Sequence, residues 1–132
     1  MIVLDASVAV EIVLSTPSGN ELAPRLLAEE SAHAPHLIDL EVAQALRRIV
    51  LRGDLDEGRA SQALADFDDL PLERYPHQIF LTRIWALRSN VTAYDAAYVA
   101  LAEALRAPLW TFDGPLARAA PPSVTVVDWS RR

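Results

Sequence analysis

Two aspartates each follow a short apolar segment that predicts a buried strand. Asp5 directly follows residues 2–4 (IVL), and Asp113 directly follows residues 109–112 (LWTF). Uniformly apolar runs of this length are typical of strands buried on both faces of a parallel sheet. Ligands bind at the carboxyl ends of such strands, so the two acids can face each other there. Asp is also favoured as a helix N-cap, and each aspartate taken alone fits either role. Because both aspartates directly follow a predicted strand, a ligand-binding role is favoured for Asp5 and Asp113.

Two further acids lie near the starts of predicted helices. Asp95 follows Thr92 by three residues, a spacing typical of a capping box. Glu41 lies in the first turn and a half of a helix predicted over residues 37–52. The simple alternatives are a capping role for Asp95 and solvent exposure for Glu41. Asp39 is near Glu41 in sequence, but two helical positions are about 200° apart, so these two side chains cannot point into the same cleft.

Carboxylates in this number suggest a site for hard cations such as Mg²⁺ or Mn²⁺, which prefer oxygen ligands. Such ions compensate the repulsion between the acids, lower the pKa of a bound water and steady the oxygens of an in-line phosphoryl displacement. Ser7 and Thr111 lie close to Asp5 and Asp113 in the chain, and their hydroxyls could orient a carboxylate or a metal-bound water. Capping and local backbone bonding are equally simple roles for both hydroxyls.

The composition excludes several other kinds of chemistry. The chain has 132 residues, of which 52% are hydrophobic, and this suits one domain over residues 1–132. There is no cysteine, and all 12 basic residues are arginine, so thiolate sites, P-loops and Schiff-base lysines are ruled out. No run of about 18 apolar residues and no signal segment is present, so we expect a cytoplasmic protein without a membrane partner. The net charge of −6 counts against nucleic-acid binding, unless bound cations or an arginine patch reverse the local field.

Strands and helices are predicted to alternate along the chain. Strands are predicted at residues 2–4, 72–75, 109–112 and 124–127, with a break at 17–20 and an extended link at 33–36. Helices are predicted at residues 6–14, 21–30, 37–52, 56–70 and 77–88, from Thr92 to Arg106, and briefly from Gly114. This alternation predicts an α/β fold, a three-layer α/β/α sandwich around a mainly parallel central sheet.

With these residues assembled, the chain resembles the PIN-domain ribonucleases, specifically the VapC-type toxins of bacterial toxin–antitoxin pairs. The matching segments are residues 3–7 (VLDAS), Pro35 with residues 40–42 (LEV), residues 87–103 (LRSNVTAYDAAYVALAE) and residues 109–113 (LWTFD). The Thr-x-Tyr-Asp-Ala-x-Tyr segment around Asp95 is the most specific. The resemblance implies metal-binding and catalytic roles for the acids Asp5, Glu41, Asp95 and Asp113, and supporting roles for Ser7 and Thr111.

The same resemblance implies RNA as substrate, Mg²⁺ or Mn²⁺ as cofactor, a homodimer, and a small VapB-like antitoxin that blocks the site. Operator DNA is expected only through the toxin–antitoxin complex. The sequence departs from the family pattern at three places. Gln44 stands where an Asn is common, and we expect little loss because the amide chemistry is kept. Glu11 and the Gly114-Pro115 pair stand where basic residues are common, and the missing charges affect the grip on RNA more than the chemistry.

Arg48 lies on the same predicted helix face as Glu41 and Gln44, and we hypothesise that it contacts an RNA phosphate. A solvated or salt-bridged arginine is the alternative. The three histidines match no metal motif and are expected in loops or caps: His33, His36 and His77. The aromatic residues are expected in the core or at an interface: Trp85, Trp110, Trp129, Tyr94 and Tyr98. The alternative function is a catalytically inactive PIN-fold module that binds RNA or protein.

Overall fold

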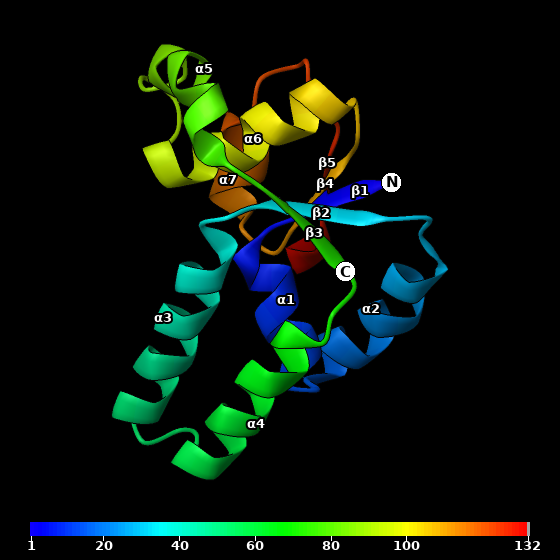
Figure 1. Cartoon of the computed structure of the whole chain (residues 1–132), viewed down its shortest axis with the longest axis vertical. Helices are drawn as coiled ribbons and strands as arrows, with labels where there is room; N and C mark the ends of the chain where they lie inside the picture. Colours follow the sequence, from blue (N-terminus) through cyan, green and yellow to red (C-terminus); the bar gives the residue numbers. More distant parts are fainter. Residues whose placement is uncertain (132) are drawn as a thin grey trace.

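The computed structural model describes residues 1–131 and contains a five-stranded sheet with the order β3-β2-β1-β4-β5 (Figure 1). Its strands are β1 (Ile2–Leu4), β2 (Ala32–Pro35), β3 (Leu72–Tyr75), β4 (Leu109–Thr111) and β5 (Val126–Asp128). All four strand pairings are parallel. Because β1 is central and neighbours β4, the carboxyl ends of these two strands lie side by side.

Helices cover both faces of the sheet. They are α1 (Ala6–Val13), α2 (Pro17–Ala28), α3 (Ile38–Leu51), α4 (Glu57–Asp68), α5 (Leu81–Ala86), α6 (Ala93–Leu105) and α7 (Gly114–Ala119), with 3₁₀ turns η1 (His77–Phe80) and η2 (Trp129–Arg131). Figure 1 shows α1 to α4 on one side of the sheet and α5 to α7 on the other. This arrangement confirms the predicted three-layer sandwich. None of the helices within residues 1–131 has the length and apolar character needed to cross a bilayer.

Helix α6 packs most deeply against the sheet and determines where Asp95 lies. Every residue from Ala96 to Ala102 is buried, and α6 contacts β1, β2 and β4. The small alanine side chains of this segment let the helix approach the strands closely. The N-terminus of α6 therefore lies beside the carboxyl ends of the central strands.

The predicted break at residues 17–20 is wrong, because α2 already begins at Pro17. Thr16 caps the helix by accepting a hydrogen bond from the Gly19 N–H at 3.0 Å, and proline is well tolerated at the first helical position. Pro24 lies inside this helix. Gly19 lies against α1, and a Cβ at this position would be 1.8 Å from the carbonyl oxygen of Glu11.

The predicted extended link at residues 33–36 overlaps a buried strand, β2, which pairs with both β1 and β3. All four of its residues are buried. Histidine and proline are uncommon in such a strand, which is why the sequence suggested a link. The helix predicted at residues 77–88 is also divided, into the 3₁₀ turn η1 and the short helix α5.

Candidate metal centre

The four predicted carboxylates line one cavity of about 420 Å³ at the carboxyl ends of β1 and β4. Asp5 follows β1, Asp113 lies just after β4, Glu41 comes from α3 and Asp95 from the first turn of α6. Ser7, Tyr98 and Arg48 line the same cavity, together with four residues of α1 and α3: Ala6, Val10, Glu11 and Ala45. The structure therefore brings together acids from four separate elements, as the sequence predicted.

Asp5 is the most buried of the four acids, with 6% of its surface exposed. Its Oδ1 accepts hydrogen bonds from the backbone N–H groups of Ser7 at 3.0 Å and Val8 at 3.3 Å, and from the Ser7 hydroxyl. Its Oδ2 accepts a hydrogen bond from the Thr111 hydroxyl at 2.5 Å. Burial raises the pKa of Asp5, although these hydrogen bonds act in the opposite direction. Asp5 is thus both the N-cap of α1 and a carboxylate on the cavity wall.

The hydroxyls of Ser7 and Thr111 connect the ends of β1 and β4. Ser7 Oγ accepts a hydrogen bond from the Phe112 N–H at 3.0 Å, and Thr111 Oγ1 accepts one from the Asp113 N–H at 2.9 Å. Asp113 in turn caps α7 by accepting a hydrogen bond from the Leu116 N–H at 3.1 Å. These bonds hold the two strand-end loops in a fixed relation, which is a supporting role of the kind expected for both hydroxyls.

Glu41 is half-buried, and its carboxylate accepts a 2.6 Å hydrogen bond from the Tyr98 hydroxyl. Burial raises the pKa of Glu41, the Tyr98 hydrogen bond lowers it, and the charge of Asp95 raises it further. Asp39 points elsewhere and pairs with Arg74 at 2.9 Å, as the helix geometry required. Tyr98 was predicted only as a core or interface residue. No local pattern around Tyr98 indicates that its hydroxyl reaches the cavity.

Asp95 is half-buried in the first turn of α6, and its backbone N–H donates to the Thr92 hydroxyl at 3.1 Å. Thr92 is therefore the N-cap of α6, and Asp95 takes part in this cap through its backbone N–H. Burial is the largest cause of the raised pKa of Asp95, followed by the charges of Asp113 and Asp5, while a hydrogen bond with Thr92 lowers it. The negative charges of Asp113 and Asp5 thus act on Asp95, and a cation in the cavity would relieve this repulsion.

The donor set of the cavity fits a hard cation that keeps part of its water shell. All the candidate ligands carry carboxylate oxygens, which suit Mg²⁺ or Mn²⁺. Within residues 1–131, no three acidic or histidine side chains are gathered closely enough to hold a metal ion as they stand. The site is therefore not a closed protein cage. Mg²⁺ commonly binds through one or two carboxylates and several waters, and the cavity offers both the acids and the space.

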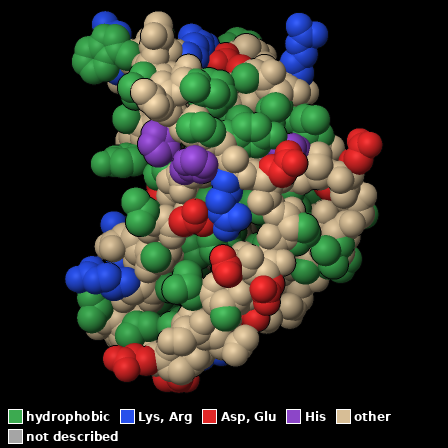
Figure 2. Space-filling model, viewed as in Figure 1, with side chains coloured by type: hydrophobic (Ala, Val, Ile, Leu, Met, Phe, Trp, Pro, Cys, Tyr) green, Lys and Arg blue, Asp and Glu red, His purple; other side chains and the backbone are tan. Residues whose placement is uncertain are grey.

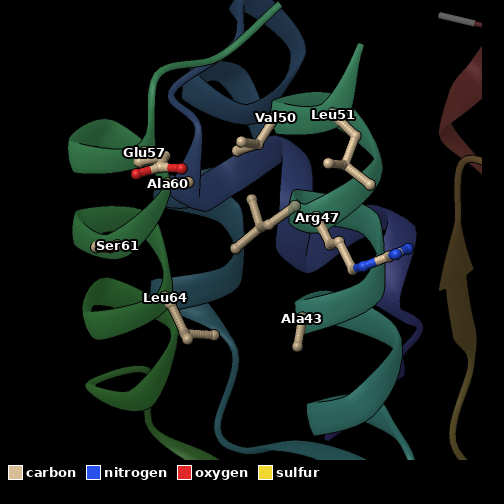
Figure 3. Close-up of a pocket in the computed structure, with 9 residues that line it drawn as sticks. Ala43, Arg47, Val50, Leu51, Glu57, Ala60, Ser61 and Leu64 are labelled. Atoms are coloured by element: carbon tan, nitrogen blue, oxygen red, sulfur yellow. The ribbon is translucent and has the colours of Figure 1, made fainter. Parts of the chain in front are cut away.

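A second concavity lies between α3 and α4, and it lacks this chemistry. Figure 3 shows Ala43, Val50 and Leu64 on its walls, with Arg47 and Glu57 at its sides. Its lining contains a single acid and is otherwise mainly apolar. A groove of this kind suits contact with another apolar surface, not metal binding.

His33 does not lie in a loop, as the sequence suggested, but in the buried strand β2. Its Nδ1 is 2.7 Å from the Tyr75 hydroxyl, and its Nε2 is 2.7 Å from the Ser31 hydroxyl. His36 and His77 are exposed and line an apolar groove beside the N-terminus of α6. No histidine lines the carboxylate cavity.

The sequence and the fold match known proteins over most of the chain. The family model described as PIN domain matches residues 2–121. The chain is 47% identical to Ribonuclease VapC12 of Mycobacterium tuberculosis over 118 residues, which cover 89% of this chain and 91% of the relative. It is 44% identical to the VapC ribonuclease Mb0985 of Mycobacterium bovis over 113 residues, covering 86% of each protein.

Two solved structures share the fold at low sequence identity. PAE2754 from Pyrobaculum aerophilum superposes with a TM-score of 0.70 at 21% identity, over 96% of this chain and 88% of that chain. VapBC2 from Rickettsia felis, bound to a DNA fragment from its promoter, gives a TM-score of 0.70 at 16% identity, over 98% and 99% of the two chains. The parallel sheet and its helices are thus those of a PIN-type α/β domain. This chain belongs to the PIN-domain family, within the group of VapC ribonucleases.

Proposed function

We propose that this chain is a divalent-metal-dependent endoribonuclease, with Mg²⁺ or Mn²⁺ as its cofactor, and the toxin of a VapBC-type toxin–antitoxin pair. The observation that carries the proposal is the cavity in which Asp5, Glu41, Asp95 and Asp113 converge from four elements. Relatives at 44–47% identity named as ribonucleases support the choice of RNA. Such a protein acts in the cytoplasm, where its substrate is found.

The residues of the cavity supply a negatively charged binding surface for a cation. Asp5, Asp95 and Asp113 present carboxylate oxygens to a cation, and Glu41 adds a fourth carboxylate held by Tyr98. When bound, the cation would activate water and stabilise the charge that develops on a phosphodiester during in-line displacement. Because Asp5 is fixed by four hydrogen bonds, it does not need to reorganise when the cation binds.

Arg48 is the candidate for phosphate contact. It is exposed and lines the carboxylate cavity, one turn along α3 from Gln44. A guanidinium at this position can hold the RNA backbone while the acids hold the cation. Arg48 is the basic residue in the lining of the cavity. We therefore expect the bound cation and Arg48 to supply most of the attraction for the RNA backbone.

We also propose a small VapB-like antitoxin as the protein partner, with operator DNA bound only through the toxin–antitoxin complex. The support is the structural likeness to VapBC2 of Rickettsia felis, which is bound to a DNA fragment from its promoter. Addition of the antitoxin is expected to abolish RNA cleavage by the isolated chain. Cleavage that persists at saturating antitoxin would contradict this part of the proposal.

A catalytically inactive PIN-fold module is the second candidate function. The net charge of −6 and the acid at Glu11, on the cavity wall, favour it, because both weaken attraction of RNA. The two functions differ in one readout. An inactive module retains partner or RNA binding without cleaving RNA in any divalent metal.

The deciding experiment is incubation of the purified chain with a mixed cellular RNA pool in Mn²⁺ or in EDTA, beside the Asp95→Asn variant. Asp39→Asn is the matched control, because Asp39 is an acid of α3 that points away from the cavity. Discrete fragments that disappear with EDTA and with Asp95→Asn, but persist with Asp39→Asn, are expected. Cleavage that survives EDTA or Asp95→Asn would overturn the metal-dependent assignment.

A further inference from the structure

The carboxylate cavity carries much more negative than positive charge. Its lining contains one arginine, Arg48, and five acids: Asp5, Glu11, Glu41, Asp95 and Asp113. On the face drawn in Figure 2, the arginines of residues 1–131 lie singly among acids and apolar side chains and form no continuous basic patch. Binding of RNA depends mainly on contacts of arginine or lysine with its phosphates. A second arginine close to the cavity would therefore matter for the grip on RNA.

Arg118 lies close to the rim of the cavity, although it is not part of the lining. It belongs to α7, and its side chain extends back along this helix to Gly114, the residue that directly follows Asp113. A Cβ at Gly114 would lie 3.1 Å from Nη1 of Arg118. Helical side chains lean toward the N-terminus, so a long one reaches the residue four positions before it. Because Gly114 has no side chain, the guanidinium fits there, next to the residue that carries the cavity acid Asp113.

The Arg118 side chain is exposed, and the ion pairs within residues 1–131 all join other groups. Asp128 is the acid nearby, since its Oδ2 would lie 3.8 Å from the same Cβ of Gly114. The pKa of Asp128 is lowered chiefly by a hydrogen bond from the Ser130 hydroxyl, and less by the charges of Arg131 and Arg118. Its Oδ1 also accepts a hydrogen bond from the Ser130 N–H at 2.9 Å. The guanidinium of Arg118 therefore keeps N–H donors for a phosphate.

Arg48 and Arg118 approach the cavity from the two strands that neighbour β1. Helix α3, which carries Arg48, follows β2, and helix α7, which carries Arg118, follows β4. Strand β1, with Asp5 at its end, lies between β2 and β4 in the sheet. The two arginines therefore flank the carboxylates, and a strand held by both crosses the acids between them. Glu11, on the α1 wall of the cavity, disfavours a path along α1 because its charge repels phosphate.

We propose that Arg118 is a second phosphate contact for RNA, on the opposite side of the carboxylates from Arg48, and that the RNA backbone crosses the cavity from α3 to α7. A guanidinium binds phosphate through parallel N–H···O hydrogen bonds, and such contacts position a strand without reading its sequence. The inference rests on the proposed action on RNA, to which it adds the direction of the strand across the site. Loss of Arg118 should weaken binding of all RNA sequences equally, because the contact is to phosphate.

The test measures binding of a short, fluorescently labelled single-stranded RNA by anisotropy at several salt concentrations. Ca²⁺ is present as an oxygen-binding cation, and a gel establishes that the RNA stays intact. We expect Arg118→Gln to lower the affinity about two- to fivefold, as for one exposed charge contact, and to reduce the salt slope by about 1. Arg118→Lys keeps the charge and should retain most of the slope. The Mn²⁺ affinity should fall in neither variant.

Arg106→Gln is the matched control, because Arg106 is an exposed arginine at the end of α6 opposite to Asp95. It should change neither the RNA affinity nor the salt slope. Asp128→Asn should act in the opposite direction and raise the RNA affinity, because it removes the negative charge near Arg118 and keeps an oxygen for Ser130. Circular dichroism establishes that each variant is folded.

An unchanged salt slope in a folded Arg118→Gln would overturn the proposal, as would an equal loss in Arg106→Gln. A loss confined to RNAs of one base composition would do so as well, and so would a native chain that binds no RNA. Cleavage is scored separately, from fragments released in Mn²⁺. A chain that binds RNA through Arg118 but releases no fragments contradicts the nuclease and supports the contact. A chain that cleaves RNA with the same salt slope in Arg118→Gln supports the nuclease and contradicts the contact.

Discussion

The hydrogen bond from Tyr98 to Glu41 links the packed core to the candidate metal site, and Tyr98→Phe removes it without altering the ring. The bond is 2.6 Å long, and its donor is almost fully buried while its acceptor is half-buried. A hydrogen bond to a charged acceptor contributes about 1.5–3 kcal/mol when both groups are buried. Because water can reach Glu41 from the cavity and replace the hydroxyl, we expect a loss of about 1 kcal/mol in the free energy of unfolding.

The same substitution should change metal binding through the pKa of Glu41. The Tyr98 hydroxyl lowers this pKa, so its removal raises a pKa that burial has already raised. Protons then compete more strongly with the cation, and Mn²⁺ affinity should fall more at pH 6 than at pH 8. Calorimetric titration with Mn²⁺ at the two pH values, with thermal unfolding in EDTA, measures both effects.

Tyr94→Phe is the matched control, since Tyr94 is a tyrosine of the same helix that is 65% exposed. It should change neither the unfolding free energy nor the Mn²⁺ affinity. If Tyr98→Phe lowers stability but leaves the affinity and its pH dependence unchanged, the bond has a purely structural role. Glu41 would then not be a ligand of the cation.

Three further predictions concern pH, packing and RNA contact. The pKa values of Asp5 and Asp95 are raised in the folded state. Their contribution to stability is therefore fully present below the unfolded pKa of about 4 and is lost as the pH rises through the folded pKa. Denaturant unfolding in EDTA should show a free energy of unfolding that falls toward neutral pH, and added Mn²⁺ should restore it. Gly19→Ala should cost about 2–4 kcal/mol in urea unfolding, because its Cβ would collide with the backbone of Glu11, whereas an unchanged midpoint would contradict this close packing of α1 and α2. Arg48→Ala should weaken RNA binding and reduce its salt slope by about 1 while leaving Mn²⁺ affinity unaltered, and an unchanged slope would exclude the phosphate contact.

The acids could be located from sequence because their position depends on local patterns. Asp5 and Asp113 follow apolar runs short enough to identify as strands, and parallel topology then brings the strand ends together. The N-caps of α1, α7 and α6 could also be predicted, because Asp and Thr side chains commonly accept a hydrogen bond from a backbone N–H in the first turn of a helix. These caps are Asp5, Asp113 and Thr92. For Asp5 and Asp113 the capping and cavity roles coexist, so the two interpretations were not exclusive.

The remaining features depend on tertiary contacts that no local pattern encodes. Tyr98 lies in a run of buried residues, and its hydroxyl meets Glu41 of α3, which is 57 positions away in the sequence. Strand β2 contains His33 and Pro35, and its pairing on both sides outweighs their low strand propensity. Helix α2 begins with a Thr16 cap followed by Pro17 at its first position. The composition of residues 17–20 alone suggested a break there.

We propose that the carboxylate cavity binds a divalent cation through acids from separate elements. Calorimetric titration of Mn²⁺ into the native chain, Asp95→Asn and Asp39→Asn measures this binding without any RNA substrate. We expect saturable binding in the native chain and in Asp39→Asn, and at least about a tenfold loss of affinity, equal to about 1.4 kcal/mol, in a folded Asp95→Asn. Equal affinity in all three proteins, or no binding in the native chain, would contradict it.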